Sequence, residues 1–454
     1  MSDDRPLRFL VIGGGPAGNT AASTAASHGA RVTLVESDVL GGAAHLWDCI
    51  PSKALVASSM RLANVRATGH LGLADPGPVR PDMSRLGERR EAITARLIAG
   101  LTGMLESQGV EIVRGRGRLA GADRAVITGP DGEHEVAFDA ALLATGSRPR
   151  RPDWAEIDGE RIITTREAYS LPELPEHMVI VGSGVSGVEL VHIFSSLGAE
   201  VTLLVSRQQV LPHRDPEVAA VLEEDFLERG VRLLKGARAV SAARESDGVI
   251  VRTEDGRTVH GSHCLLAIGS VPNSEDLGLE AAGIAHRSGN VTVDGFQRTT
   301  VPHIYAAGDV TGQLLLSSVA AMQGRTVGLH ATGNQVPPVD VRKAAQAIFT
   351  EPEIASVGLE EADAAAEGRK VRITKVPFAA NPRSLIQANT RGFAKVISDP
   401  ATHVVLGGTV VGHHASELIG MVALAVQAGL RTDQLAQTLF VHPSLAESIA
   451  DAAE

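Results

Sequence analysis

One pattern occurs twice in this chain and constrains its fold more than any other: an apolar strand, a glycine-rich turn, a helix and a second strand. In the first copy, residues 8–37, Gly13, Gly15 and Gly18 follow the apolar segment FLVI, and Glu36 ends the segment RVTLVE. Such glycines let the backbone approach a pyrophosphate at a helix N-terminus, and the acidic residue binds ribose hydroxyls. The pattern predicts a dinucleotide-binding unit.

The second copy spans residues 178–206 and reads MVIVGSGVSGVELVHIFSSLGAEVTLLVS. Its glycines Gly182, Gly184 and Gly187 have the same spacing as those of the first copy. Two such units in one chain predict two bound cofactors, with electrons passing from one to the other.

The two copies differ at the end of the second strand. Val205, followed by Ser206 and Arg207, stands where the first copy has Glu36. A carboxylate here binds a free 2′-hydroxyl and repels a 2′-phosphate, whereas a nearby arginine accommodates the phosphate. We therefore expect the second unit to accept NADPH, with NADH as a further donor. The alternative is that Arg207 is a solvated turn residue and the site is unselective.

The length of 454 residues predicts about three domains of roughly 150 residues each. The net charge of −11 and the aromatic content of 3% argue against a nucleic-acid partner. No apolar run in the sequence reaches the roughly 18 residues that a membrane span needs. The first residues lack the apolar segment of a signal peptide, so a cytoplasmic location is expected.

Three further apolar segments end in glycine, at residues 140–150, 263–273 and 303–312. The third contains Asp309, which is either a ligand of the polyhydroxyl chain of a flavin or a turn residue. After Pro337-Pro338, alternating apolar residues predict antiparallel strands, and residues 417–430 predict an amphipathic helix. We expect a third, partner-binding domain there.

The segment GGAAHLWDCIPSK, residues 41–53, has the frame of a redox-active disulfide site but only one cysteine. Ala44 stands where the partner of Cys49 would be, and Cys264 is the only other cysteine of the sequence. Cys264 lies within an apolar strand and is expected to be a core residue. Thiol–disulfide exchange requires an attacking thiolate, so an internal dithiol cannot carry electrons here.

Several motifs occur in an order that resembles the pyridine nucleotide-disulfide oxidoreductases over essentially the whole chain. They are GGGPAG, CIPSK, ATGSRP, GSGVSGVE, AIGSVPN, AAGDVTG, FTEPEIASVG and HPSLAE. The resemblance implies an α/β fold with two Rossmann-like dinucleotide-binding domains, for FAD and NAD(P), plus a C-terminal α+β dimerisation domain. It assigns residues 1–150 and 273–335 to FAD, 151–272 to NAD(P), and 336–454 to a homodimer interface that sends His442 into the other subunit.

The resemblance also implies the site residues. For FAD they are Gly13, Gly15, Pro16, Ala17, Gly18, Glu36, Ser37, Gly42, Lys53, Thr145, Gly146, Gly308 and Asp309. For NAD(P)H they are Gly182, Gly184, Val185, Ser186, Gly187, Glu189, Ser206, Arg207 and Gly269. The predicted catalytic residues are Cys49, Lys53, His442 and Glu447, and no metal ligand is predicted. In family members, the lysine of CIPSK lies beside the flavin N5 and pairs with the glutamate that maps to Glu189.

Two of these residues have alternative roles. Cys49 precedes a predicted helix whose start would favour its thiolate, so it either acts on the flavin or on peroxide, or it is an inert relic. His442 and Glu447 match the acid–base pair of the family. Here His442 either protonates a reduced acceptor or is retained at the dimer interface, with Pro443 starting a helix.

Because the paired cysteine is missing, we expect lipoamide, glutathione and mycothione not to be substrates. The sequence favours an FAD-dependent NAD(P)H dehydrogenase that passes hydride through FAD directly to a quinone-type acceptor. The loop of residues 41–53 resembles that of actinobacterial NAD(P)H quinone reductases that lack the disulfide. One alternative is a soluble transhydrogenase, which Trp47 would fit; another is a flavoprotein redox sensor that uses Cys49.

Overall fold

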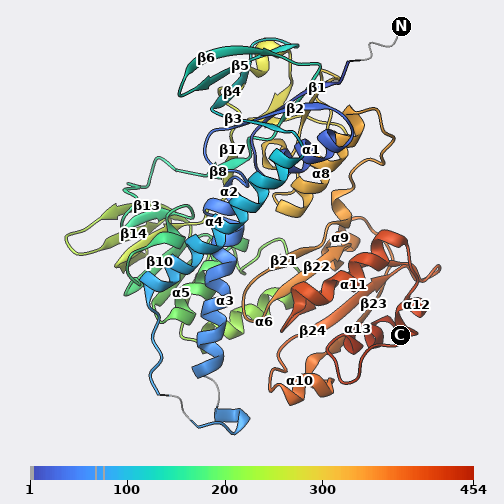
Figure 1. Ribbon diagram of the computed structural model, residues 1–454. Helices are drawn as coiled ribbons and strands as arrows, with labels where there is room; N and C mark the ends of the chain where they lie inside the picture. The colour runs from blue at the N-terminus through green and yellow to red at the C-terminus, as the bar shows by residue number, and fades with distance from the viewer. Residues whose placement is uncertain (1–4, 67–68, 75–76) are drawn as a thin grey trace. The chain divides into compact units, whose positions relative to one another are not determined.

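The first repeat folds into a parallel sheet with the strand order β20-β7-β1-β2-β3 (Figure 1). The computed structural model describes residues 5–66, 69–74 and 77–454. The sheet consists of β1 (Arg8–Ile12), β2 (Arg31–Glu36), β3 (Glu111–Arg114), β7 (Ala140–Leu143) and β20 (Ile304–Ala306). Its central strands are apolar along their length because both faces are covered, as in other α/β proteins.

Two helices pack side by side against this sheet, α1 (Pro16–Ser27) and α8 (Ser317–Ala331). Gly324 of α8 faces the Ala17 carbonyl so closely that a Cβ there would lie 2.1 Å from the oxygen. The antiparallel strands β4 (Arg116–Leu119), β5 (Arg124–Gly129) and β6 (Gly132–Ala137) form a separate small sheet. The structure thus confirms the α/β fold that the first repeat predicts.

The second repeat forms a second parallel sheet, with the order β12-β11-β10-β16-β9. Its strands are β9 (Ile162–Thr164), β10 (His177–Val181), β11 (Glu200–Val205), β12 (Arg232–Lys235) and β16 (His263–Leu266). The helices α5 (Val185–Leu197) and α6 (Pro216–Glu228) contribute apolar side chains to the same core. A smaller antiparallel sheet follows, made of β13 (Ala239–Arg244), β14 (Val249–Thr253) and β15 (Thr258–Gly261).

The C-terminal region is an antiparallel sheet covered by helices, as the alternating pattern predicts. The sheet order is β21-β22-β25-β24-β23, with β21 (Gln346–Ile348), β22 (Ile354–Gly358), β23 (Arg372–Pro377), β24 (Phe393–Ser398) and β25 (Val405–Val411). The helices α11 (Ala415–Ala428) and α13 (Glu447–Ala453) pack on it (Figure 1). The predicted helix 417–430 is displaced by two residues because Gly429 adopts a left-handed conformation and ends α11.

Shorter elements complete the fold. The remaining helices are α2 (Ala43–Leu46), α3 (Cys49–Arg66), α4 (Met83–Ser107), α7 (Leu279–Ala282), α9 (Glu361–Ala366), α10 (Pro382–Ile386) and α12 (Thr432–Ala436). The remaining strands are β8 (Ser147–Pro149), β17 (Ser270–Pro272), β18 (His286–Arg287) and β19 (Asn290–Val291). Within the described ranges, no helix has both the length and the apolar character needed to cross a bilayer.

The chain divides into two compact units. The first contains Met1–Ser52, Glu88–Arg150 and Ser270–Val341, and the second contains Lys53–Gly87, Arg151–Gly269 and Arg342–Glu454. The second unit therefore holds the second parallel sheet together with the C-terminal sheet. The three-domain boundaries proposed from the sequence stay a prediction.

One local expectation is wrong. Pro443 does not start a helix; α13 begins four residues later, at Glu447. The Glu447 carboxylate accepts a hydrogen bond of 2.8 Å from the Ser444 amide, and this contact holds the segment before the helix in a non-helical turn.

We predict that Phe226→Ala lowers the free energy of unfolding by about 3–5 kcal/mol, because Phe226 of α6 is 0% exposed and its removal leaves a cavity. The neighbouring Leu227 is 59% exposed, so Leu227→Ala should change this free energy by less than about 0.5 kcal/mol. Urea denaturation followed by circular dichroism measures both. Equal losses in the two variants would contradict the packing described here.

Candidate functional site

The glycine turn of the first unit brings α1 against β1 as a dinucleotide fold requires. A Cβ on Gly18 would lie 1.8 Å from the Gly13 carbonyl oxygen, so only glycine allows this approach. Gly15 is the N-cap of α1, and Pro16 and Ala17 form its first turn. The amides at this helix end have no partner within the helix and are suited to bind a pyrophosphate.

Glu36 lies next to this turn. Its carboxylate accepts hydrogen bonds from the Gly14 amide at 2.7 Å and the Asp38 amide at 2.7 Å. These two bonds fix the carboxylate at the carboxyl end of β2 and leave it lone pairs for ribose hydroxyls. Ser37 follows and is exposed, while Gly42 packs its backbone against Gly15.

A second set of predicted residues follows β7, the neighbour of β1. The Thr145 hydroxyl donates to the Asn273 carbonyl at 2.7 Å, and the Asn273 side-chain amide donates to the Thr145 carbonyl at 2.9 Å. Gly146 accepts a hydrogen bond from the Asn273 backbone amide. The segments 145–149 and 270–273 are thereby paired, with β8 and β17 antiparallel.

Asp309 lies after β20 at the same edge of the sheet. Its carboxylate accepts a 2.7 Å hydrogen bond from the Ser147 hydroxyl. Burial raises the pKa of Asp309, and the bond from Ser147 only partly offsets this effect. The preceding Gly308 donates its amide to the buried Gln323 side chain at 2.7 Å. A partly desolvated carboxylate with one hydroxyl partner is suited to bind further hydroxyl groups.

The turn of the second unit repeats this geometry. A Cβ on Gly187 would lie 1.9 Å from the Gly182 carbonyl oxygen, and Gly184 is the N-cap of α5. Val185 and Ser186 are exposed at the helix start. At the same edge of the sheet, Ser206 and Arg207 follow β11 and Gly269 follows β16. These residues predicted for NAD(P)H therefore also lie near the carboxyl ends of parallel strands.

The carboxyl end of β11 carries no acidic side chain. Val205 is fully buried, so the position that carries Glu36 in the first unit here holds an apolar core residue. Arg207 is exposed in the loop that follows. The two strand ends therefore differ in charge: one carries the Glu36 carboxylate and the other is followed by the Arg207 guanidinium.

An ion pair connects α3 with α5 inside the second unit. The Lys53 ammonium donates to Glu189 at 2.8 Å, and the other Glu189 oxygen accepts the Phe349 amide at 2.9 Å. The Lys53 nitrogen also lies 4.8 Å from the centre of the Phe349 ring. Phe349 therefore holds both members of the pair, a role that its sequence position did not indicate.

The two cysteines have different environments. Cys49 is the first residue of α3 and is partly exposed, while Ala44 lies in the short helix α2. Cys264 is 0% exposed in β16, and burial raises the pKa of its thiol to about 12. The expectation that Cys264 is a core residue is confirmed, because a buried neutral thiol cannot act as an attacking group.

His442 and Glu447 form a contact near the C-terminus. The His442 Nδ1 lies 2.8 Å from Glu447 Oε1, and the Ser444 amide donates to the other carboxylate oxygen. The hydrogen bond from Ser444, followed by that from His442, lowers the pKa of Glu447. The His442 side chain is 70% exposed, so its outer nitrogen is accessible.

These arrangements fit two dinucleotide cofactors. In each turn, a backbone carbonyl oxygen lies within 2 Å of the position that a Cβ on the facing glycine would occupy. Each turn also has exposed or uncommitted polar groups at the neighbouring strand ends. The first unit fits a cofactor with a free ribose and a polyhydroxyl chain. The second has no carboxylate at the corresponding strand end and is followed by the exposed Arg207.

The chain belongs to the pyridine nucleotide-disulphide oxidoreductase family. Residues 7–324 match that family, and residues 344–453 match its dimerisation domain. The enzymes of this family depend on FAD and NAD(P)H.

Among the relatives, the NAD(P)H dehydrogenase (quinone) of Mycobacterium tuberculosis is 45% identical, with 98% of this chain and 93% of that protein aligned. The dihydrolipoyl dehydrogenase of Geobacillus stearothermophilus is 34% identical, over 98% and 95% of the two chains. The crystal structure of LpdA from Mycobacterium tuberculosis superposes with a TM-score of 0.94 at 44% identity, covering 98% of this chain and 99% of that one.

Sequence reasoning did not identify Ser147, Gln323 and Phe349. Each contacts a predicted residue: Ser147 bonds Asp309, Gln323 bonds Gly308, and Phe349 bonds Glu189. Ser147 is part of the motif ATGSRP and Phe349 opens FTEPEIASVG, so the motifs were signals that the individual residues mattered.

We predict that Cys264 does not react with a thiol reagent in the folded protein. The variant Cys49→Ser should show no rapidly reacting thiol at pH 8 and one after unfolding in guanidinium chloride, because burial keeps Cys264 neutral and inaccessible. Titration with a disulfide reagent that releases a coloured thiol measures this. Rapid labelling of the folded variant would contradict the buried environment.

Proposed function

We propose that this chain is an FAD-dependent NAD(P)H dehydrogenase that reduces quinone-type acceptors directly, without a cysteine pair. The observation that carries the proposal is the replacement of the paired cysteine by Ala44, together with the burial of Cys264. No second thiol is then placed to pass electrons through a dithiol. The name of the 45% identical relative, an NAD(P)H dehydrogenase (quinone), supports the same acceptor class.

The roles of the residues follow from their chemistry. Bound FAD supplies hydride acceptance from a nicotinamide and return of electrons to the acceptor. We assign the FAD to the turn of Gly13, Gly15 and Gly18, with Glu36 and Asp309 holding its hydroxyl groups. Lys53, fixed by Glu189, would supply a positive charge for electrostatic stabilisation of the bound cofactor.

His442 is assigned to proton transfer. Glu447 fixes the His442 ring through Nδ1, which leaves Nε2 to donate a proton to a reduced quinone. Cys49 is not required for this sequence of steps.

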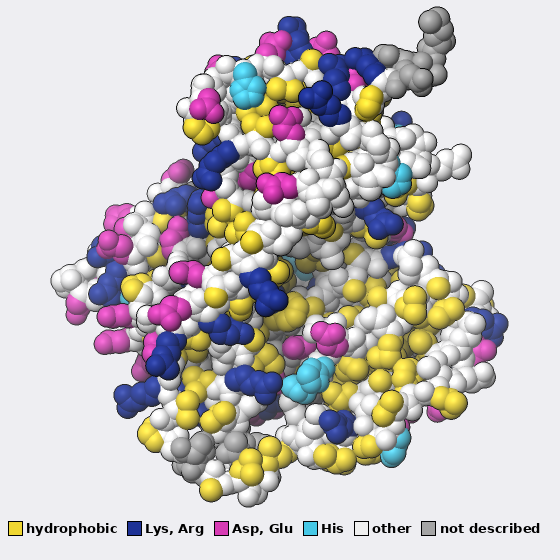
Figure 2. Space-filling view, viewed as in Figure 1, with side chains coloured by type: hydrophobic (Ala, Val, Ile, Leu, Met, Phe, Trp, Pro, Cys, Tyr) yellow, Lys and Arg dark blue, Asp and Glu magenta, His cyan; other side chains and the backbone are white. Residues whose placement is uncertain are grey.

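We further propose a homodimer that works in the cytoplasm, where NADPH is available. The match to the dimerisation domain supports the dimer. Several large apolar side chains of the C-terminal region are exposed in a single chain, including Leu439 at 100% and Val441 at 77%. Figure 2 shows apolar side chains gathered over the region of α11. Because Leu439 and Val441 adjoin His442, their burial by a second copy would place His442 at a subunit interface.

The acceptor is tested by anaerobic oxidation of NADPH with menadione, thio-NAD or lipoamide. We expect turnover with menadione and none with lipoamide, and we expect Cys49→Ser to retain most of this activity because no thiol carries electrons. Lipoamide turnover would refute direct transfer. Reduction of thio-NAD without menadione turnover would assign the chain to the transhydrogenases, and loss of activity in Cys49→Ser would indicate a thiol-based role.

The coenzyme preference is tested at Arg207. A charge-assisted hydrogen bond contributes about 2 kcal/mol, so Arg207→Ala should raise the KM for NADPH roughly thirtyfold and leave the KM for NADH nearly unchanged. Arg252→Ala is the matched control, since Arg252 is an exposed arginine of β14 in the same unit. Unchanged KM values for both coenzymes would show that Arg207 is a solvated turn residue.

A further inference from the structure

The loop of residues 206–215 connects β11 to α6 and carries Arg207, the residue assigned above to NADPH. The Leu211 amide of this loop donates to the Ser183 carbonyl at 2.8 Å, and Ser183 lies between Gly182 and Gly184 of the glycine turn. The Val210 amide donates to Glu223 of α6 at 2.9 Å. The 206–215 loop therefore touches the turn that would bind the pyrophosphate.

The shape of this loop is not one that the local sequence favours. Leu211 has φ +48°, in the left-handed region that residues with a side chain rarely adopt. Such a conformation persists where the surrounding structure holds it. The groups that hold the far end of the loop come from the C-terminal sheet.

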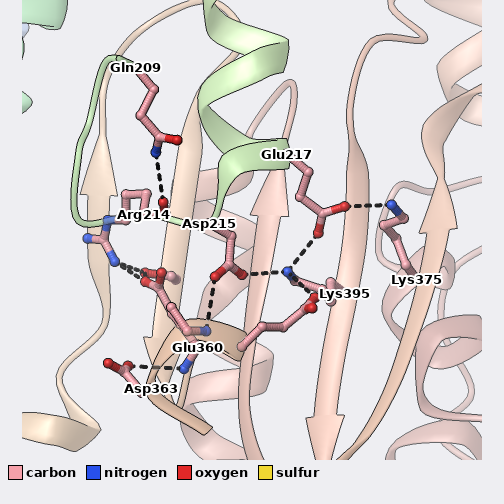
Figure 3. Close-up of polar contacts among 11 residues, drawn as sticks. Gln209, Arg214, Asp215, Glu217, Glu360, Asp363, Lys375 and Lys395 are labelled. Carbon is pink, nitrogen blue, oxygen red and sulfur yellow. Dashed lines mark hydrogen bonds and ion pairs between the residues drawn. The ribbon is translucent and has the colours of Figure 1, made fainter. Parts of the chain in front are cut away.

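Arg214 makes the first anchor (Figure 3). Its guanidinium forms an ion pair with Glu360 and donates to the Ser356 hydroxyl and the Gln346 side chain, each at 2.8 Å. Gln346 lies in β21 and Ser356 in β22, while Glu360 lies in the segment that follows β22. The Arg214 carbonyl also accepts a bond of 3.0 Å from Gln209, which closes the loop on itself.

Lys395 of β24 makes the second anchor. Its ammonium donates at 2.7 Å to each of Asp215, Glu217 and Glu361 (Figure 3). Asp215 is the last residue of the loop and the N-cap of α6. Burial by itself would lower the pKa of Lys395, but the three carboxylates outweigh burial and raise it, so the ammonium stays charged. The three carboxylates form an acidic cluster whose centre is this lysine.

Charged groups in the interior are a costly way to hold two segments together. Lys395 is 1% exposed, and a buried ion pair is often no more stable than apolar side chains of the same volume. What buried ion pairs provide is a fixed geometry, since each charge has to meet its partner. The two anchors are therefore suited to fix the path of the 206–215 loop.

We propose that Arg214 and Lys395 are positioning residues for the coenzyme: through them, the C-terminal sheet holds the 206–215 loop in the shape that binds NAD(P)H. This inference rests on the proposed function in assigning the second glycine turn to NAD(P)H. Neither residue contacts the reacting atoms, so their loss weakens coenzyme binding and leaves the rate of hydride transfer at saturation unchanged.

The test measures binding and reduction separately. Calorimetric titration of the FAD-loaded dimer or monomer with NADP⁺ and NAD⁺ gives the Kd. Anaerobic stopped-flow bleaching of the flavin by NADPH and NADH gives the limiting rate. We expect Arg214→Met and Glu360→Gln to raise the Kd for both coenzymes about tenfold, within the range of typical coupling between sites, with an unchanged limiting rate. Arg207→Ala, in contrast, affects the phosphorylated coenzyme alone.

The double variant Arg214→Met/Glu360→Gln provides a second check. If both residues act through one contact, the double variant should bind coenzyme no more weakly than Arg214→Met alone. Ser356→Ala removes a single neutral hydrogen bond to Arg214 and should give a smaller effect of the same sign. This variant and Glu360→Gln decide the question if Arg214→Met does not fold.

The matched control is Arg391→Met. Arg391 pairs with Asp225 at 2.7 Å and with Glu228, so it joins the C-terminal region to the opposite end of α6 and does not touch the loop. The Arg391→Met variant should have a lower melting temperature than the wild-type protein and unchanged Kd values for both coenzymes.

Two results would overturn the inference. One is an unchanged Kd in folded, FAD-loaded Arg214→Met or Glu360→Gln, and the other is an equal rise in Arg391→Met. A wild-type protein that binds NADP⁺ but shows no menadione turnover would refute the proposed function alone, and the Kd values would still decide this inference. A wild-type protein that binds neither coenzyme would refute both.

Discussion

In each dinucleotide fold, the start of a helix and the turn before it make a very close backbone approach. The rest of the structure depends on this one constraint. Gly18 faces the Gly13 carbonyl and Gly187 faces the Gly182 carbonyl at distances that exclude any side chain. Because the helices start there, their unpaired amides lie at the carboxyl edge of the parallel sheets. The neighbouring strand ends then place Glu36 in one unit and Arg207 in the other beside those amides.

The chemistry of the chain is set by what one loop lacks. Ala44 removes the thiol that would exchange with a substrate disulfide, while Lys53, Glu189 and the contact between His442 and Glu447 are kept. The ion pair and the imidazole–carboxylate contact thus persist without a cysteine pair. Direct transfer from a flavin to a diffusible acceptor is the reaction that such a set supports.

The second unit joins the second glycine turn to the C-terminal sheet. The Phe349 amide holds Glu189, and the Phe349 ring contacts Lys53. The 206–215 loop is held by Glu360 and Lys395. Both contacts come from the region that matches the dimerisation domain of the family. In the proposal made here, the C-terminal sheet would support the coenzyme site in addition to offering a surface to a second copy.

The sequence by itself determined the two glycine turns, the strands that flank them, the antiparallel C-terminal sheet and the missing thiol. These features depend on spacing over fewer than about forty residues, where backbone geometry leaves few alternatives. Only the tertiary structure decided that Ser147 meets Asp309, that Phe349 holds Glu189, and that Lys395 receives three carboxylates. In the first two of these contacts, the partners are more than 100 residues apart in the sequence. Tertiary packing brings such residues together, and a linear sequence pattern does not specify that packing.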